Sequence, residues 1–234
     1  MSSNIDRRTF LTTAGSAAAA ATLAGCSGSD DGSASDETTG TETTDGNEAE
    51  SDLSGTLVYA RGDHPQNYDP QQTTSGEVAK VSNQIYDQLV GFTPGSGGQL
   101  RDGLATEYSL EGTTATLTLR EDVTFHNGES FTAADVRATI RRFTDNEYEH
   151  YLGDENRSGY GPFTFGNWVD TVEATGEYEV TIELTQQYAP FLRNLAMFAA
   201  AILSKSQIES LDNQVQLGTE PQGTGAFEFS ELDN

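Results

Sequence analysis

The feature that most constrains the fold of this chain is the stretch Leu119–Phe143, which reads LREDVTFHNGESFTAADVRATIRRF. The residues that lead into it, Thr113–Arg120, alternate between apolar and polar side chains, which predicts a strand with one buried face. Asn127 and Gly128 then form a dipeptide that tolerates the positive φ angles of a tight turn. The first half of the stretch therefore predicts a strand that ends in a turn.

The second half of the stretch predicts a capped helix. Thr132 and Asp135 have the spacing of a capping box, and an acid is favourable near a helix start. Three apolar residues recur at helical spacing and predict a buried stripe: Val136, Ile140 and Phe143. The three arginines among them are expected to face away from the core: Arg137, Arg141 and Arg142.

The whole stretch resembles the signature of the family 5 extracellular solute-binding proteins, which serve ABC importers of dipeptides, oligopeptides or nickel. The signature, LR-x-x-V-x-FH-[DN]-G-x-x-[FL]-[TS]-A-x-DV, is matched here by Leu119, Arg120, Val123, Phe125, His126, Asn127, Gly128, Phe131, Thr132, Ala133, Asp135 and Val136. The alternative is a strand–turn–helix unit of an unrelated α/β protein. The matched residues are turn, cap and core residues, so they indicate a scaffold and say little about chemistry.

Further segments resemble the same family over residues 57–234. The last is Pro221–Phe229, similar to P-x-GTG-P-[FY]-x-[FL], in which Gly223, Thr224 and Gly225 match and Ala226 replaces the usual proline. The resemblance implies an α/β fold, a type II periplasmic-binding-protein lobe with a mixed sheet and flanking helices. Because family members are much longer, we expect residues 57–234 to form only an N-terminal lobe, with the second lobe and the returning chain absent.

The charge of the chain is strongly negative. Lys and Arg number 12 against 37 Asp and Glu, which gives a net charge of −25. The acids are scattered along the chain, which favours adaptation to molar salt, and hence a haloarchaeal source, because a Debye length of about 3 Å at 1 M screens their repulsion. The lack of a basic patch argues against a nucleic-acid partner. The single cysteine excludes an internal disulfide and a thiolate metal cluster.

Residues 1–25 are predicted to be a twin-arginine lipoprotein signal peptide. The export pattern consists of Arg7, Arg8, Phe10 and Leu11. Leu23-Ala24-Gly25-Cys26 resembles a lipobox, in which the thiol of Cys26 is lipidated and the chain is cut before it. The alternative is an ordinary buried cysteine. This interpretation places the protein on the outer face of the cytoplasmic membrane, held by a lipid anchor.

Residues 26–56 are predicted to be an unfolded tether. They are rich in Ser, Thr, Gly and acids, and nine acids between residues 27 and 54 face no base. A segment of this composition cannot bury enough apolar surface to fold. No spacing in it resembles an EF-hand calcium loop.

The globular part begins with Leu57–Ala60, an apolar run that predicts a strand buried on both faces. A polar loop follows and closes on Asp69-Pro70. In the family this loop lies near the cleft between lobes, so the resemblance makes three residues candidates for ligand binding: His64, Tyr68 and Asp69. The alternative is a surface loop with a Pro-fixed turn. Thr74–Glu77 then predicts a capping box for a helix that runs past Leu89 to Gly91.

The rest of the chain predicts four further elements. Val169–Ala174 and Tyr178–Leu184 alternate and predict a hairpin. A helix with Pro190 near its first turn is expected after Tyr188. Ala201–Leu203 predicts a short strand, and Ser204–Leu211 resembles a strand end with the helix behind it.

No catalytic motif supports an enzyme, because the chain has no G-x-S-x-G, HExxH or P-loop pattern. His126 belongs to the signature turn, which favours a structural role over metal ligation. A metal site from His64 and His150 has weak support, so we expect neither metal nor cofactor. The resemblance implies capture of a small peptide or similar solute between two lobes and its delivery to ABC permease subunits. The alternatives are a ligand-sensing surface module without a transporter and a secreted hydrolase, which the absent motifs disfavour.

Overall fold

The computed structural model describes residues 56–60, 62 and 67–231. The chain divides into two units, Met1–Thr56 and Leu57–Asn234. The predictions for the export signal (Arg7, Arg8, Phe10 and Leu11), the lipidation site Cys26, most of the tether and His64 concern residues outside the described ranges. Everything that follows concerns the unit that begins at Leu57.

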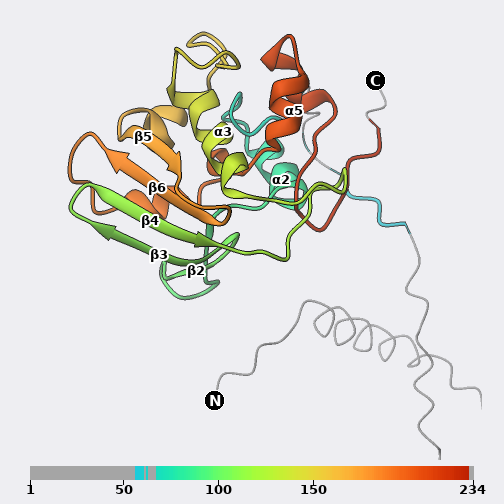
Figure 1. Ribbon diagram of the computed structural model, residues 1–234. Helices are drawn as coiled ribbons and strands as arrows, with labels where there is room; N and C mark the ends of the chain where they lie inside the picture. Colours follow the sequence, from blue (N-terminus) through green and yellow to red (C-terminus); the bar gives the residue numbers. More distant parts are fainter. Residues whose placement is uncertain (1–55, 61, 63–66, 232–234) are drawn as a thin grey trace, which may run out of the picture. The chain divides into compact units, whose positions relative to one another are not determined.

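A four-stranded antiparallel sheet forms one layer of this unit (Figure 1). Its strands are β3 (Ala105–Glu111), β4 (Thr114–Leu119), β5 (Val169–Ala174) and β6 (Glu179–Leu184), in the order β3-β4-β6-β5. A separate hairpin joins β1 (Val90–Phe92) to β2 (Leu100–Asp102). The predicted strand at residues 113–120 and the predicted hairpin at 169–184 are confirmed.

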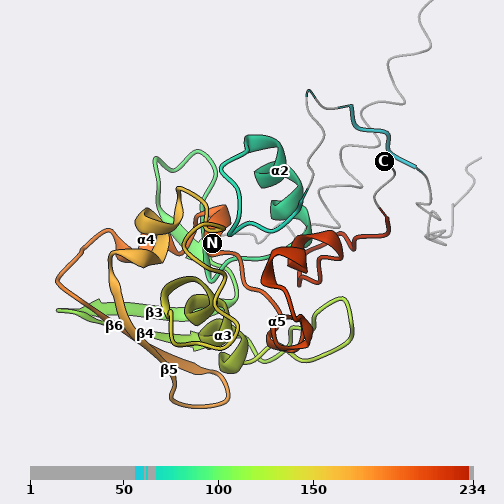
Figure 2. The same cartoon turned by 90° about the horizontal axis from the view of Figure 1, so that it is seen from above.

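Helices cover one face of the sheet, as the view from above shows (Figure 2). The long helix α3 (Ala133–Thr144) packs against β5 and β6. Smaller elements complete the layer: α2 (Gly76–Ile85), α4 (Phe191–Asn194), α5 (Lys205–Ser210), the π-helix η1 (Pro162–Gly166) and the 3-10 helices η2 (Phe198–Ala200) and η3 (Gln214–Thr219). The predicted α/β class with flanking helices is confirmed, and all strand pairings in the described residues are antiparallel.

The core lies between the sheet and α3. In β4 the apolar residues Ala115, Leu117 and Leu119 are buried, while the threonines between them are exposed. The predicted helix stripe meets this face, because Val136, Ile140 and Phe143 are all buried in the same apolar cluster. Full burial of one such side chain contributes about 1.5–3 kcal/mol relative to leaving it exposed. The alternating strand and the helical stripe thus form two sides of one core.

The turn and the cap of the signature form as predicted. Gly128 has φ +85°, and its N–H donates to the carbonyl of Phe125 at 2.9 Å. The N–H of Thr132 donates to the carboxylate of Asp135 at 2.8 Å, and α3 begins at the next residue. These bonds satisfy backbone groups that would otherwise lack partners at a turn and a helix start.

Three predicted elements differ from the structure. Leu57–Ala60 was expected to be a buried strand, but it is not in a strand, and Leu57 and Val58 are each 87% exposed. Helix α2 is capped by Ser75 and ends at Ile85, well before Gly91, because residues 90–92 form β1 instead. Ala201–Leu203 is buried but lies in no strand. An apolar run does not by itself make a strand, because strand pairing also requires a neighbour at the right distance.

Candidate functional site

The candidate site is the loop of residues 67–72, whose backbone is held by its own side chains. The amide oxygen of Asn67 accepts a hydrogen bond from the N–H of Asp69 at 2.7 Å. The carboxylate of Asp69 in turn accepts from the N–H of Gln71 at 2.8 Å and from the side chain of Gln72 at 2.7 Å. Local bonds of this kind are typical of Asn and Asp in turns.

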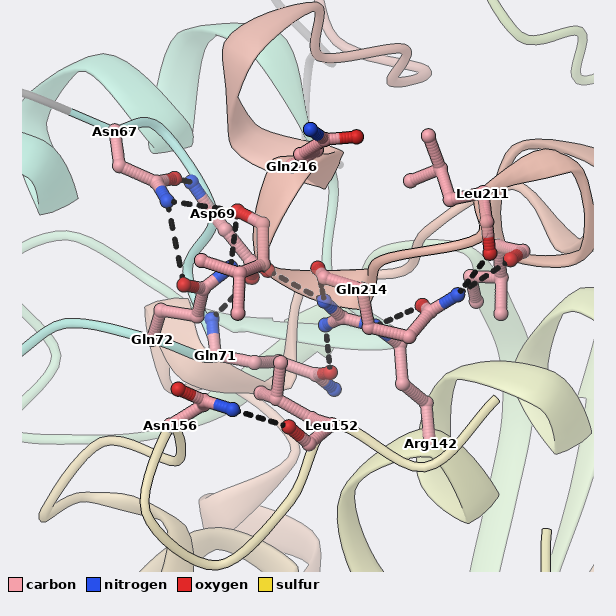
Figure 3. Close-up of polar contacts among 12 residues, drawn as sticks. Asn67, Asp69, Gln71, Gln72, Arg142, Leu152, Asn156, Leu211, Gln214 and Gln216 are labelled. Atoms are coloured by element: carbon pink, nitrogen blue, oxygen red, sulfur yellow. Dashed lines mark hydrogen bonds and ion pairs between the residues drawn. The ribbon is translucent and has the colours of Figure 1, made fainter. Parts of the chain in front are cut away.

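Arg142 joins this loop to helix α3 and to η3 (Figure 3). Its guanidinium donates to Asp69 Oδ2 at 2.7 Å, to Gln71 Oε1 at 2.7 Å, to Gln214 Oε1 at 2.9 Å and to the Gln214 carbonyl at 2.7 Å. Both Arg142 and Asp69 are fully buried. Three chain segments about 70 residues apart therefore meet at one guanidinium.

The expectation that Arg142 faces away from the core is wrong. Amphipathic periodicity assigns a charged side chain to solvent, but here Asp69, Gln71 and Gln214 supply acceptors from outside the helix. A buried charge is tolerable only when it is paired and hydrogen-bonded in this way. No local sequence signal identifies these partners, because they lie far away along the chain.

The structure does not present Tyr68 and Asp69 to solvent. Tyr68 is buried, its N–H donates to the carbonyl of Gly218 at 3.0 Å, and its ring centroid lies 5.7 Å from that of Phe229. The carboxylate of Asp69 is occupied by Arg142 and Gln72. Direct ligand contact by Asp69 therefore has no support in this geometry. Asp69 instead fixes the shape of the loop around it.

Tyr86 lies beside this ionic group. Its hydroxyl is buried and has no hydrogen-bond partner among the described residues. Burial raises the pKa of Tyr86 well above its usual value, and the negative charge of Asp69 adds to the rise while Arg142 opposes it. The phenol therefore stays neutral and packs as an apolar ring with a polar tip.

The second element of the candidate site is the contact between His126 and the Gly223–Gly225 segment. The N–H of Gly223 donates to His126 Nδ1 at 3.3 Å, and His126 Nε2 lies 2.9 Å from the carbonyl of Gly225. A neutral ring with its proton on Nε2 satisfies both contacts. Both ring nitrogens are engaged by the chain, so His126 links the signature turn to the Gly223–Gly225 segment.

The two glycines of this segment allow a close approach to the end of α2. The N–H of Gly225 donates to the carbonyl of Ile85 at 2.8 Å, and the hydroxyl of Thr224 donates to Asp87 Oδ2 at 3.2 Å. A Cβ on Gly223 would lie 1.9 Å from the carbonyl oxygen of Ile85, and one on Gly225 would lie 2.4 Å from that of Gln84. Only glycine therefore fits at both positions.

Exposed apolar side chains occur at both ends of the described globular unit. They are Leu57, Val58, Tyr59 and Phe227. In the described ranges no group of three or more His, Cys, Asp or Glu side chains could hold a metal ion. Nor does any helix there have the length and apolar character needed to cross a membrane.

Comparison with known proteins finds relatives that are named as peptide-binding proteins. The chain is 31% identical over 191 residues to the di/tripeptide-binding protein 2 of Pseudomonas aeruginosa, and 32% identical over 192 residues to the dipeptide-binding protein of Escherichia coli. In each case the match covers 75% of this chain and 35% of the relative. The chain thus spans about a third of the length of the curated relatives it matches.

Solved structures agree with these relatives. The periplasmic binding protein DppA from Helicobacter pylori, solved in complex with the peptide STSA, matches with a TM-score of 0.68 and 31% identity. That match covers 76% of this chain and 37% of the other. The dipeptide-binding protein of Pseudoalteromonas sp. SM9913 in complex with Met-Leu matches with a TM-score of 0.65 and 29% identity, over 72% of this chain and 36% of the other.

A family profile covers more than half of the sequence. Residues 99–234 match the family described as bacterial extracellular solute-binding proteins, family 5 Middle. This range contains the signature turn, the capped helix α3 and the His126 contact with Gly223–Gly225. The chain therefore belongs to the family 5 extracellular solute-binding proteins.

Proposed function

We propose that this protein supplies part of the peptide-binding component of an ABC importer. The observation that carries the proposal is the shared fold with a relative solved in complex with a peptide, at 31% identity. The described residues offer ordered backbone and apolar side chains, which suit a peptide of variable sequence. Capture is a binding event with no covalent step, in keeping with relatives that are solute-binding proteins.

The role proposed for residues 67–72 is to support one side of the ligand cleft, because Tyr68, Asp69 and Gln71 are themselves buried. The Arg142–Asp69 pair fixes the loop, so its surface is set before ligand arrives. A preformed surface loses less conformational entropy on binding than one that must be ordered. Ligand would then be held between this part and a second lobe that closes on it by hinge motion. The partners are a small peptide and the permease subunits that receive it.

The proposed location is the outer face of the cytoplasmic membrane. Export would use Arg7, Arg8, Phe10 and Leu11, and Cys26 would carry the lipid. The acidic residues 26–56 would serve as the tether, in a cell whose high salt screens the negative charge. A ligand-sensing module without a transporter remains the alternative, and association of the chain with permease subunits discriminates between the two.

Nuclear magnetic resonance titration of the ¹⁵N-labelled chain tests the proposal. Di- to pentapeptides should shift backbone signals at residues 67–72 and near Phe227, whereas a sugar at the same concentration should not. Because one side of a cleft makes about half of the contacts, we expect dissociation constants in roughly the millimolar range. Peptide shifts confined to the outer face of the sheet would contradict the proposal. Saturable micromolar binding by the monomer would show that one lobe suffices.

A further inference from the structure

The few cationic side chains of this acidic protein are unevenly placed. The described residues contain nine Lys and Arg side chains, and three of them border a single hollow between α3, α5 and the end of β5. These are Arg137, Arg141 and Lys205. The hollow has a volume of about 130 Å³, and small side chains leave it open: Ala134, Ala138 and Ala174.

Arg137 is unusual among these nine cations. Its guanidinium makes no hydrogen bond to any residue that the structure describes, whereas the other eight each have a partner. Its Nε is shielded from solvent and has no hydrogen-bond acceptor. The nearest carboxylate is that of Glu173, which is largely exposed, and its Oε2 lies 3.6 Å from this same Nε, an ion-pair contact too long for a hydrogen bond. A shielded N–H without an acceptor is costly, and a bound anion would remove that cost.

Arg141 adds further donors on the same side. Its Nε donates to Asp145 at 2.8 Å, and its guanidinium carbon lies 4.4 Å from the centre of the Tyr148 ring. Its two terminal nitrogens have no hydrogen-bond partner among the described residues. Burial raises the pKa of Tyr148, with Glu209 adding to the rise and Arg141 and Arg137 opposing it. Both guanidinium groups therefore act on the ring that forms one wall of the hollow.

The acids at this place do not cancel the cations. Glu209 is the one carboxylate that lines the hollow, and it pairs with Lys205 at 2.7 Å. Glu173 and Asp145 pair with the two arginines from outside the hollow, where they line the neighbouring groove. Two arginines thus keep unused donors beside a space large enough for a single small anion. Arginine donors in a fixed plane match the geometry of an oxyanion.

We propose that this hollow binds one oxyanion, through Arg137 and Arg141. The shared chemistry is that of phosphate, sulfate and the carboxylate group. The site is independent of the peptide cleft proposed above, because none of the residues that line it belongs to the loop 67–72. Such a site would let an acidic protein hold an anion despite the repulsion from the protein's net negative charge.

Phosphate titration of the full chain tests this proposal at constant ionic strength, with chloride as the replaced ion. The signal to follow is the side-chain Nε–H resonance of Arg137, because an anion bound by this guanidinium should change the surroundings of that proton. We expect a saturable shift in the wild type. Arg137→Gln should weaken phosphate binding at least about tenfold, since a hydrogen bond to a charged group is lost. For Arg137→Gln, backbone signals of residues 137–141 report binding.

Two further variants separate the site from general charge effects. Arg120→Gln removes an exposed arginine that pairs with Asp122 and does not line the hollow, so its phosphate affinity should equal that of the wild type. Ala174→Leu fills the hollow without changing the charge and should abolish binding. Thermal unfolding of each variant checks that it folds.

A second probe identifies the source of the anion. N-acetyl-aspartate amide presents the carboxylate of a protein side chain, and tighter binding of this probe than of phosphate would indicate an acidic polypeptide partner. Tighter binding of phosphate would indicate a free inorganic ion. No saturable shift with either probe would overturn the proposal, and so would equal affinity in the wild type and Arg137→Gln.

Discussion

The carboxylate of Asp135 holds the start of two helices, because one oxygen accepts the backbone N–H of Lys205 at 2.8 Å. Its other oxygen accepts the N–H of Thr132 at the start of its own helix, also at 2.8 Å. Lys205 is the first residue of α5 and lies 70 residues further along the chain. Asp135, which the sequence pattern identifies as part of the capping box of α3, thus also binds the first residue of α5.

The pH dependence of stability should reveal the burial of Asp135. Burial raises the pKa of Asp135, although hydrogen bonds from Lys205 and Thr132 oppose the rise. The folded state therefore holds the proton more tightly than the unfolded chain, whose value is near 3.8. The contribution of Asp135 to the free energy of unfolding should fall as pH rises from below 3.8 through the raised pKa, and then stay constant.

Urea denaturation at a series of pH values measures this contribution as the difference between the wild type and Asp135→Asn. Asp122 provides a control of opposite sign, because its hydrogen bond with Arg120 lowers its pKa. The wild-type advantage over Asp122→Asn should be present above the unfolded pKa and disappear as pH falls. A difference for Asp135→Asn that grows with pH would contradict the assignment.

Replacing Asp69 by Asn should leave the positive charge of Arg142 buried without a countercharge. We expect a loss of about 3–5 kcal/mol in the free energy of unfolding, the usual cost of breaking a buried pair. Glu209→Gln breaks an exposed pair with Lys205 and should cost less than about 1 kcal/mol. Chemical denaturation in molar salt gives both values. Equal losses in the free energy of unfolding would show that the buried pair stabilises the fold no more than the exposed pair does.

Replacing Gly223 by Ala should displace the Gly223–Gly225 segment from α2. The new Cβ would lie 1.9 Å from the carbonyl oxygen of Ile85, so the backbone must move. We expect a loss of about 2 kcal/mol or more and a shift of the His126 ring signals. The matched control is Gly76→Ala, where a Cβ meets nothing within 4 Å. An unchanged thermal midpoint in Gly223→Ala would refute this account.

Low ionic strength should destabilise the fold. The described residues contain 25 Asp and Glu against nine Lys and Arg. Repulsion between the acids reaches over a Debye length of about 3 Å at 1 M salt, but over about 30 Å at 0.01 M. Circular dichroism should show a lower and broader thermal transition in dilute buffer than in molar potassium chloride. Two equally cooperative transitions at the same temperature would count against salt adaptation.

Replacing Cys26 by Ala should release the protein from membranes. Cys26 carries the only thiol of the chain, so it is the only residue that could take a thioether-linked lipid. Fractionation of cells that express the wild type and Cys26→Ala should find the variant in the medium. A variant that stays with salt-washed vesicles would exclude the lipid anchor.

Local sequence was sufficient for the elements whose bonds close within a few residues. The turn at Gly128, the cap of α3 and the alternating strand β4 depend on neighbours three or four positions away. The predicted extent of α2 is too long, because apolar spacing continues to Leu89 although the helix ends at Ile85 and β1 begins at Val90. Periodicity predicts which residues are buried more reliably than it predicts where an element ends.

The sequence by itself determined the strand–turn–helix core and the family to which it belongs, because these depend on short-range bonds and on apolar spacing. Only the tertiary structure decided the place of Arg142 and the shape of the loop 67–72. The acceptors of Arg142 come from Asp69, Gln71 and Gln214, about 70 residues away in either direction. A charged side chain can be buried only where distant segments neutralise it, and no local pattern contains that information.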